Sequence, residues 1–445
     1  MEYAHRYRAC PPKHIAEALE QHLNIHRQAY NYTRYEYNNC QHEPTVANGA
    51  FKHHKRLPDW KDEYPIFKDV HSKSLQKTVT RFYQNLSNLA EKKKEGYKVG
   101  KLKWKKPREY QSFTYSQSGF ELKHTSGPDT NTATLNLTKI GDIPIRYHRP
   151  IPDNAEIKEV TVKKHTTSEW YVSLSLDIDE THLPDKTPAD ELKGDNCVGI
   201  DLGILSYVHT SDGLSLEQLD VEADYERLGK AQHVLDRREY GSENWEKQRE
   251  RVANIKRRIR RKILDYQHKI TSWLTTTEYD AVFVEDLDVK PMLEDSHNAR
   301  NKQDAAWARF IKLLEYKADL NGCYVEKVEP AGTTKECSEC GASTDKPVWV
   351  REHSCPSCGF EIDRDWNASL NVLQRGFELL GERLGLGQSE VQRLKETGTF
   401  AGSVQQEQIP AETVVETGTP LVRENGKPHC LDNPASWQVG QSSSQ

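Results

Sequence analysis

Two Cys-x-x-Cys pairs constrain the fold of this 445-residue chain more than any other feature of its sequence. Cys337 and Cys340 form the first pair, and Cys355 and Cys358 follow after fourteen residues. Each pair can turn both sulfurs toward one point, and two such turns complete the tetrahedron that Zn²⁺ prefers. The alternative is two unrelated redox or buried pairs. Four thiolates leave no open coordination position, so the spacing predicts one structural zinc.

The low apolar and high charged content of the chain indicates a protein whose surface is mostly exposed to solvent. Apolar residues make up 35% and charged residues 29% of the chain. No stretch approaches the roughly eighteen apolar residues that a membrane span needs, and the first residues lack an apolar signal segment. We therefore expect a cytoplasmic, nucleoid-associated protein without a membrane partner. Cysteine pairs in that compartment indicate metal rather than disulfides.

The net charge of −5 argues at first against a nucleic-acid partner, but its distribution is uneven. Basic residues are concentrated in the segments Lys92–Arg108 and Arg237–Lys262, and local charge sets the field that phosphates meet. The first segment also carries aromatic residues on which bases can stack. A flexible basic loop and a solvated helix face are the plain alternatives. The predicted nucleic-acid contacts are Lys98, Lys101, Lys103, Trp104, Lys105, Lys106, Arg257, Arg258 and Arg261.

The first 194 residues are predicted to form a nucleic-acid-recognition lobe. Apolar residues at helical spacing indicate helices within a part that covers about 12–110. Residues 133–180 instead alternate with a period of two, which is typical of half-buried strands. Strands at about 1–10 and 111–183 are therefore expected to build a small β-barrel.

Strands and helices alternate in residues 195–380, which predicts an α/β domain with a partly parallel sheet. The cysteine pairs interrupt this domain, so the zinc ribbon at about 333–361 is predicted to be an insertion. Beyond it, residues 381–445 are acidic and poor in large apolar side chains. We expect that tail to be disordered, and its deletion after Gly387 to leave activity intact. The fold class is thus multidomain α+β.

Three acidic motifs lie within the α/β region. Asp201 stands inside an apolar strand, and Glu285 ends another. Asp363 and Asp365 precede the last helix. A buried acid is costly unless it is paired or coordinated, although each acid alone also suits a strand end, a turn or a helix cap. Carboxylates that converge from separate elements are what a pair of Mg²⁺ ions needs to hydrolyse a phosphodiester.

These motifs together resemble the TnpB (OrfB) family, transposon-encoded relatives of type V CRISPR nucleases. The resemblance spans roughly residues 3–380 and implies an RNA-guided DNA endonuclease with a RuvC-like, RNase H-type domain. It implies a guide RNA and a target DNA as partners, and it assigns Asp201, Glu285 and Asp365 to two catalytic Mg²⁺ ions. Trp366 stands where the family usually has a small aliphatic residue. The matching motifs are Gly199-Ile200-Asp201-Leu202-Gly203, Val284-Glu285-Asp286-Leu287, the two cysteine pairs and Asp363-Arg364-Asp365-Trp366-Asn367-Ala368-Ser369-Leu370-Asn371.

Two other classes of function stay open on the sequence. One is a DNA-binding accessory or regulatory transposition protein whose carboxylates perform no chemistry. The other is a strand-transfer transposase, which joins DNA ends as well as cutting them. Metal-dependent cleavage separates the first class from a nuclease, and joined products separate the second. The oligomeric state is not indicated.

Overall fold

The computed structural model describes residues 2–39, 46–124, 131–276, 279–287, 306–347, 349–398, 406–417, 421–424 and 427–430. The chain divides into two compact units, Met1–His182 and Leu183–Gln445. The boundary predicted from the sequence, after residue 194, lies a short way beyond this one. Within the described ranges, no helix combines the length and the apolar character needed to cross a membrane.

The first unit is built around a nearly closed antiparallel sheet. Its strand order is β2-β6-β7-β1-β5-β4-β3, so the first strand of the chain lies in the middle. The longest pairings join β6 to β7 and β7 to β1. The strands are β1 (Glu2–Ala9), β2 (Ser112–Ser116), β3 (Phe120–His124), β4 (Thr132–Leu137), β5 (Gly141–Arg146), β6 (Ala155–Lys164) and β7 (Trp170–Ile178).

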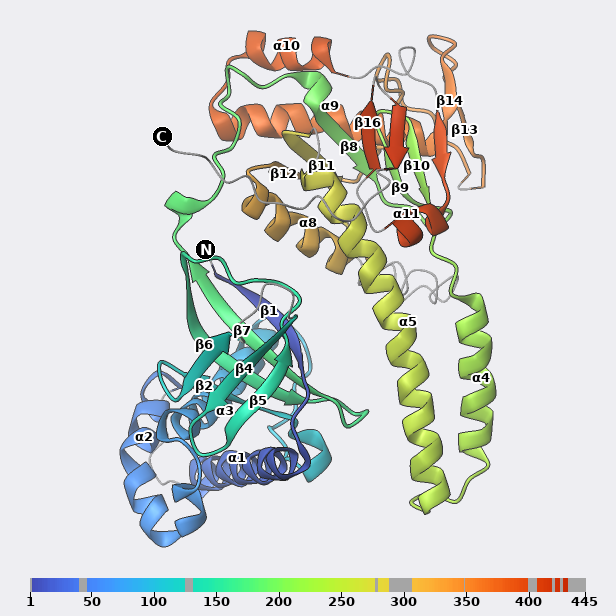
Figure 1. The fold of residues 1–445 in the computed structure, drawn as a ribbon. Helices are drawn as coiled ribbons and strands as arrows, with labels where there is room; N and C mark the ends of the chain where they lie inside the picture. Colours follow the sequence, from blue (N-terminus) through green and yellow to red (C-terminus); the bar gives the residue numbers. More distant parts are fainter. Residues whose placement is uncertain are drawn as a thin grey trace. The chain divides into compact units, whose positions relative to one another are not determined.

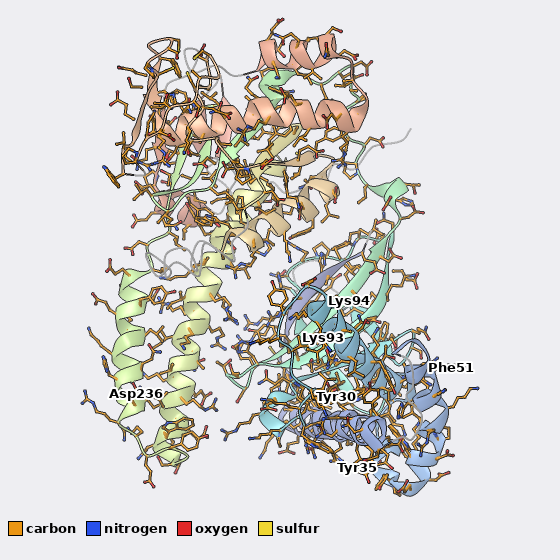
Figure 2. The ribbon with its side chains drawn as sticks, turned by 180° about the vertical axis from the view of Figure 1, so that it is seen from behind. Tyr30, Tyr35, Phe51, Lys93, Lys94 and Asp236 are labelled. Carbon is orange, nitrogen blue, oxygen red and sulfur yellow. The ribbon has the colours of Figure 1, made fainter. Side chains whose placement is uncertain are left out.

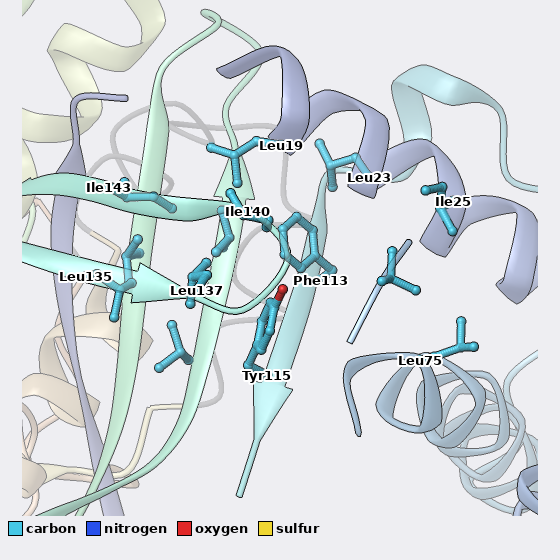
Figure 3. Packing of buried hydrophobic residues seen from close by; sticks show 14 of the residues in the cluster. Leu19, Leu23, Ile25, Leu75, Phe113, Tyr115, Leu135, Leu137, Ile140 and Ile143 are labelled. Carbon is cyan, nitrogen blue, oxygen red and sulfur yellow. The ribbon is translucent and has the colours of Figure 1, made fainter. Parts of the chain in front are cut away.

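The helices α1 (Lys13–Asn39) and α3 (Ser72–Lys94) pack against this sheet, and α2 (Val46–Glu63) packs against α3. The apolar positions of α1 and α3 recur every three or four residues, so each helix presents one buried stripe. Figure 3 shows Leu19 and Leu23 of α1 beside Phe113 and Tyr115 of β2, with Leu135 and Leu137 of β4 in the same core. This packing joins the helices and the sheet in one hydrophobic core.

The second unit contains a six-stranded mixed sheet with the order β12-β11-β8-β9-β10-β15. Three neighbouring strands, β12, β11 and β8, run parallel, whereas β8, β9 and β10 form an antiparallel meander. The strands are β8 (Cys197–Asp201), β9 (Ser206–Thr210), β10 (Leu214–Glu217), β11 (Ala281–Glu285), β12 (Tyr324–Val328) and β15 (Glu407–Ile409).

Helices cover both faces of this sheet (Figure 1). One face packs against α5 (Glu243–Thr276) and α8 (Trp307–Asn321), and the other packs against α9 (Arg364–Leu384) and α10 (Gln388–Thr397). Burial on both faces explains why β8 and β11 read as almost unbroken apolar runs. The remaining elements are α4 (Glu222–Asp236), β13 (Glu352–Ser354), β14 (Glu361–Asp363), α11 (Ala411–Thr417), β16 (Leu421–Glu424) and β17 (Lys427–Cys430).

The prediction of a disordered segment from residue 381 onward is wrong for much of that segment. The helix α9 continues to Leu384, α10 follows it, and β15 pairs in parallel with β10. Few residues there are apolar, but several of the described ones are buried in the domain core, among them Leu394 and Ile409. A low average hydrophobicity therefore does not exclude folding, because a few buried apolar side chains hold this segment against the domain.

Truncating Leu394 to alanine tests whether this segment belongs to the folded unit. The side chain is fully buried beneath α9, so its loss should lower the free energy of unfolding of the second unit by about 2–5 kcal/mol. Urea denaturation followed by tryptophan fluorescence measures the change. The matched control is Leu205→Ala, because Leu205 is 68% exposed and its truncation should change little. Equal stability of the two variants would contradict a docked segment.

Candidate active site and metal centre

Asp201 and Glu285 lie on the same face of the central sheet because of strand alternation. Cys197 and Ala281 are opposite one another in the parallel pair of β8 and β11, and the register continues to Ile200 and Val284. Side chains alternate along a strand, so every second residue faces the same side. The face that carries Cys197 and Ala281 packs under α9, and it also carries the two acids, each one residue after the last paired residue of its strand.

The start of α9 brings a third acid to this face. A Cβ atom on Gly199 would lie 2.3 Å from the carbonyl oxygen of Ser369, so the helix rests directly on β8 and needs glycine there. Asp363 is the N-cap residue, and its Oδ1 accepts hydrogen bonds from the backbone of Asp365 at 2.8 Å and of Trp366 at 3.1 Å. The Asp365 side chain is left for other partners, and it is buried.

The carboxylates of Glu285 and Asp365 repel the buried carboxylate of Asp201. Burial raises the pKa of Asp201 well above its usual range, and the carboxylates of Glu285 and Asp365 raise it further. Burial also raises the pKa of Glu285, although a hydrogen bond from Thr333 opposes that shift. A cation would relieve this repulsion, which makes the cluster chemically suited to hard divalent ions.

Neighbouring polar groups hold two of these acids. Thr333 donates to Glu285 Oε1 at 2.6 Å, and Arg351 donates to Asp365 Oδ2. Among the described residues, the four cysteines form a cluster that could hold a metal ion, and their sulfur atoms all lie within 4.8 Å of one another.

The four predicted cysteines form a separate cluster that fits zinc. Sγ of Cys337 lies 3.7 Å from Sγ of Cys358, and Sγ of Cys340 lies 3.6 Å from Sγ of Cys355. Zn–S bonds of about 2.3 Å place tetrahedral sulfurs about 3.8 Å apart, so the spacing suits the ion. The backbone N–H of Cys358 lowers the pKa of Cys355 to about 6, whereas burial and the neighbouring thiols raise the pKa of Cys358 to about 12. A metal ion would have to stabilise the thiolate form of all four cysteines.

Each cysteine pair is shaped by the same backbone turn. Gly341 donates to the carbonyl of Cys337 at 2.8 Å, and Gly359 donates to that of Cys355 at 2.9 Å. The φ angles of Gly341 and Gly359 are +73° and +75°, a conformation that other residues rarely adopt. The glycines that follow each pair in the sequence are therefore required by the geometry of the turn.

Two asparagines of α9 connect the cysteine cluster to the acids. Asn367 accepts from the backbone of Ser338 at 3.0 Å and donates to the carbonyl of Glu336 at 2.7 Å. Asn371 donates to the carbonyls of Thr333 and Glu336, each at 2.8 Å. The helix that carries Asp365 thus also holds the first cysteine turn and the residue that binds Glu285.

The basic segment of the first unit lies along α1 with its backbone fixed. Asn31 exchanges two hydrogen bonds with the backbone of Lys105, at 2.8 and 3.0 Å, and Arg34 donates to the carbonyl of Leu102 at 2.7 Å. The guanidinium of Arg34 stands 4.9 Å from the centre of the half-exposed Trp104 ring. Figure 2 labels Lys93 and Lys94 at the end of α3, where the segment begins. Lys98, Lys101, Lys103 and Lys106 are exposed, and Lys105 is half-buried.

The basic helix α5 forms a hairpin with α4 and is partly neutralised there. Asp224 of α4 is buried, and its carboxylate lies 2.6 Å from Lys262 Nζ and 3.6 Å from Arg258 Nε. The hydrogen bond from Lys262 holds the pKa of Asp224 below its usual range. Arg258 therefore helps to join the two helices, whereas Arg261 is exposed and Arg257 is half-buried on the same helix.

Sequence reasoning missed several residues of the acidic site. Thr333 and Arg351 come from the ribbon, and their contacts depend on how it folds against α9. His209 stands opposite Asp201 in the pairing of β8 and β9, a register that a sequence pattern does not reveal. Asp363 is the helix cap of α9, one of the alternatives that the sequence left open for each acid.

Comparison with known proteins matches two family models to the second unit. The OrfB_IS605 model, described as "Probable transposase", covers residues 178–295, and the model "Cas12f1-like, TNB domain" covers residues 307–372. The acids Asp201 and Glu285 lie in the first match. The cysteine cluster and Asp365 lie in the second. Both models therefore fall on the part of the chain that carries the site.

Curated relatives extend the similarity to most of the chain. A Streptomyces pristinaespiralis protein named "Putative RNA-guided DNA endonuclease" is 32% identical over 386 residues, which covers 84% of this chain and 89% of the relative. An Escherichia coli protein, "Putative RNA-guided DNA endonuclease InsQ", is 26% identical and covers 73% and 80%. The chain belongs to the TnpB (OrfB) family, which confirms the resemblance.

A solved structure shares the fold. The structure titled as that of the mini-RNA-guided endonuclease CRISPR-Cas phi3 superposes with a TM-score of 0.50 at 8% identity, covering 84% of this chain and 92% of that chain. At this identity the likeness concerns the fold alone. It supports the mixed architecture of helices, a nearly closed sheet and a second α/β sheet.

Metal analysis of freshly purified, unchelated protein should find about one zinc per chain. The reason is the four-sulfur cluster, whose spacing matches tetrahedral coordination. Cys340→Ser should release the zinc and lower the unfolding temperature, since structural zinc contributes folding free energy. Cys10→Ser is the control, because Cys10 is an exposed free cysteine of the other unit. Zinc-free, fully stable wild-type protein would contradict the assignment.

Replacing Asp201 with asparagine should stabilise the metal-free protein. The folded pKa of Asp201 is raised, so the wild type loses stability as pH rises from about 4, the pKa of an unfolded aspartate, toward the folded value. Asparagine does not ionise, so the variant does not lose this stability. In chelator at pH 8 the unfolding midpoint should rise by about 2–4 °C, the shift that roughly 1 kcal/mol gives, and the difference should vanish below pH 4.

Thermal unfolding of the two proteins across that pH range measures the effect. Asp236→Asn serves as the control, because Asp236 is exposed at the end of α4 (Figure 2). A destabilised Asp201→Asn variant at pH 8 would show that the acids do not repel one another.

Proposed function

We propose that this chain is a transposon-associated, RNA-guided DNA endonuclease that hydrolyses DNA phosphodiesters. The observation that carries the proposal is the placement of three buried acids, Asp201, Glu285 and Asp365, on one face of one sheet. They come from two neighbouring strands and a helix start. The names of the relatives support the same activity, because the chain covers most of their length.

The second unit is proposed to be an RNase H-like, RuvC-type nuclease domain. Its sheet combines an antiparallel meander of β8, β9 and β10 with parallel β11 and β12, which supports this fold. The region 333–361 is proposed to be a zinc ribbon inserted before α9, held there by Asn367 and Asn371. The zinc would stabilise the ribbon and take no part in hydrolysis.

Two Mg²⁺ ions, when bound, would supply an activated water and stabilise the leaving oxygen of the cut strand. The chain's own residues prepare that site. Thr333 fixes one oxygen of Glu285, and the cap at Asp363 fixes the backbone of Asp365. This arrangement supports Asp365, rather than Asp363, as the ligand of the third motif. Arg351 balances the charge of Asp365 in the metal-free protein.

The nucleic acids are proposed to bind through backbone phosphates. The segment 98–106 offers exposed lysines and a half-exposed tryptophan on a backbone that α1 fixes in place. Preformed geometry of this kind lowers the ordering cost of binding. Arg257 and Arg261 of α5 are proposed as further contacts, while Arg258 is partly engaged by Asp224. Guide RNA and target DNA are the proposed partners.

Replacing any of the three acids with alanine should abolish cleavage while RNA binding persists. Each removal takes away a ligand of a metal pair worth several kcal/mol, so cleavage should fall about a thousand-fold or more. The measurement is cutting of plasmid DNA by protein purified with its RNA, in Mg²⁺. Asp236→Ala, remote from the acids on α4, is the control.

Several outcomes would redirect the proposal. Full activity of Asp365→Ala with loss of activity in Asp363→Ala would exchange the roles of these two residues. Activity in all the variants would remove the nuclease assignment and favour a DNA-binding accessory protein. Joined DNA ends among the products would instead favour a strand-transfer transposase, the activity that the description of the matched family model names.

RNA binding should be steeply salt-dependent despite the net charge of −5. Replacing Lys103, Lys105 and Lys106 with glutamate should weaken binding to all RNA sequences. The slope of log affinity against log salt concentration should become shallower by about 2, because each single-strand phosphate contact contributes about 0.7 to that slope. Filter binding at several salt concentrations measures this. Reversal of Lys68 and Lys123, exposed lysines outside the segment, is the control. Salt-insensitive binding would show that the basic segments are solvated surfaces that make no contacts with phosphates.

A further inference from the structure

His209 lies among the acids although neither the motifs nor the proposed metal ligands include it. It faces Asp201 across the pairing of β8 with β9, so the two side chains share one face of the sheet. Its ring is buried, and its Nε2 lies 3.9 Å from Oδ1 of Asp363. The orientation of the His209 ring therefore affects the positions that the neighbouring carboxylates can take.

The partner of His209 comes from the C-terminal segment. The side-chain nitrogen of Gln406 lies 3.1 Å from the same Nε2 atom. An amide offers both a donor and an acceptor, so Gln406 can satisfy that nitrogen whether or not it carries a proton. A buried ring nitrogen without such a partner is costly, because it has lost its hydrogen bond to water.

The position of Gln406 is fixed by the strand that follows it. Glu407 of β15 is paired with Leu214 of β10, and its backbone donates to the carbonyl of Gly213 at 2.9 Å. Ile409, at the end of β15, is buried in the core that lies under α5. The Nζ atom of Lys269 on α5 donates to the carbonyl of Val415 at 2.8 Å. The segment is thus held on both sides of the strand.

A continuous set of contacts links this segment to the third acid. Gln406 meets His209, His209 stands near Asp363, and Asp363 accepts from the backbone N–H of Asp365. Groups that orient metal ligands from behind often change metal affinity by about 10–100-fold when they are removed. The C-terminal segment occupies that position here, although it is distant in sequence from the three acidic motifs.

We propose that the C-terminal segment is a positioning element of the acidic site, and that Gln406 acts by fixing His209 beside Asp201 and Asp363. The segment completes the sheet edge and sets the arrangement of the carboxylates before any cation binds. This inference rests on the proposed function only in taking the three acids as a divalent-cation site. Gln406 itself touches none of the proposed metal ligands, so it is a positioning residue.

The test uses the full-length protein and the variant Gln406→Met, which keeps the length of the side chain and removes its amide. Mn²⁺ binding is measured by calorimetry, with Asp201→Ala defining the signal of the acidic site. DNA cleavage is measured as a function of Mg²⁺ concentration. We expect about tenfold weaker Mn²⁺ binding and a similar shift in the Mg²⁺ requirement, with cleavage at saturating Mg²⁺ near that of the wild type.

Gln408→Met is the matched control. Gln408 lies two residues further along the same segment, and its amide donates at 2.8 Å to Glu217, away from the acids. It should bind Mn²⁺ and use Mg²⁺ as the wild type does. Unchanged Mn²⁺ affinity in Gln406→Met, or an equal loss in both variants, would overturn the positioning role. Wild-type protein that binds Mn²⁺ through Asp201 but never cuts DNA would refute the proposed function, and the binding comparison would still judge this inference.

Discussion

The repulsion that Glu285 and Asp365 exert on the buried carboxylate of Asp201 is the constraint on which the acidic site of the second unit depends. Charges of one sign in a water-excluded site destabilise the fold, so other interactions must hold them. The parallel pairing of β8 and β11 fixes two acids, and direct contact of α9 with Gly199 brings the third. The domain thus carries a local energetic cost that divalent cations would relieve.

The cysteine cluster contributes to the same end from outside the sheet. Asn367 and Asn371 of α9 bind the backbone of the first cysteine turn, and Thr333 just before that turn binds Glu285. The asparagines that follow the third acidic motif therefore join ribbon, helix and acids into one hydrogen-bonded assembly. Zinc at the four sulfurs would make that assembly rigid, although it lies apart from the acids.

The parts that sequence predicted are those that depend on local pattern. Continuous apolar runs place Asp201 and Glu285 on buried strands, and the spacing of the cysteines requires the four sulfurs to converge. Residues such as His209, Arg351 and Gln406 reach the acids through strand register and through the packing of distant segments, which no local pattern encodes. The tail was misjudged because its composition was averaged, whereas its folding depends on a few buried positions such as Leu394 and Ile409.

The most direct test of the account is to locate bound Mn²⁺ by anomalous scattering in crystals of the protein with its nucleic acids. The account predicts ions within about 2–2.6 Å of carboxylate oxygens of Asp201, Glu285 and Asp365, and zinc at the four cysteines. Mn²⁺ that binds elsewhere, with these three carboxylates left uncoordinated in a complex that cuts DNA, would contradict it.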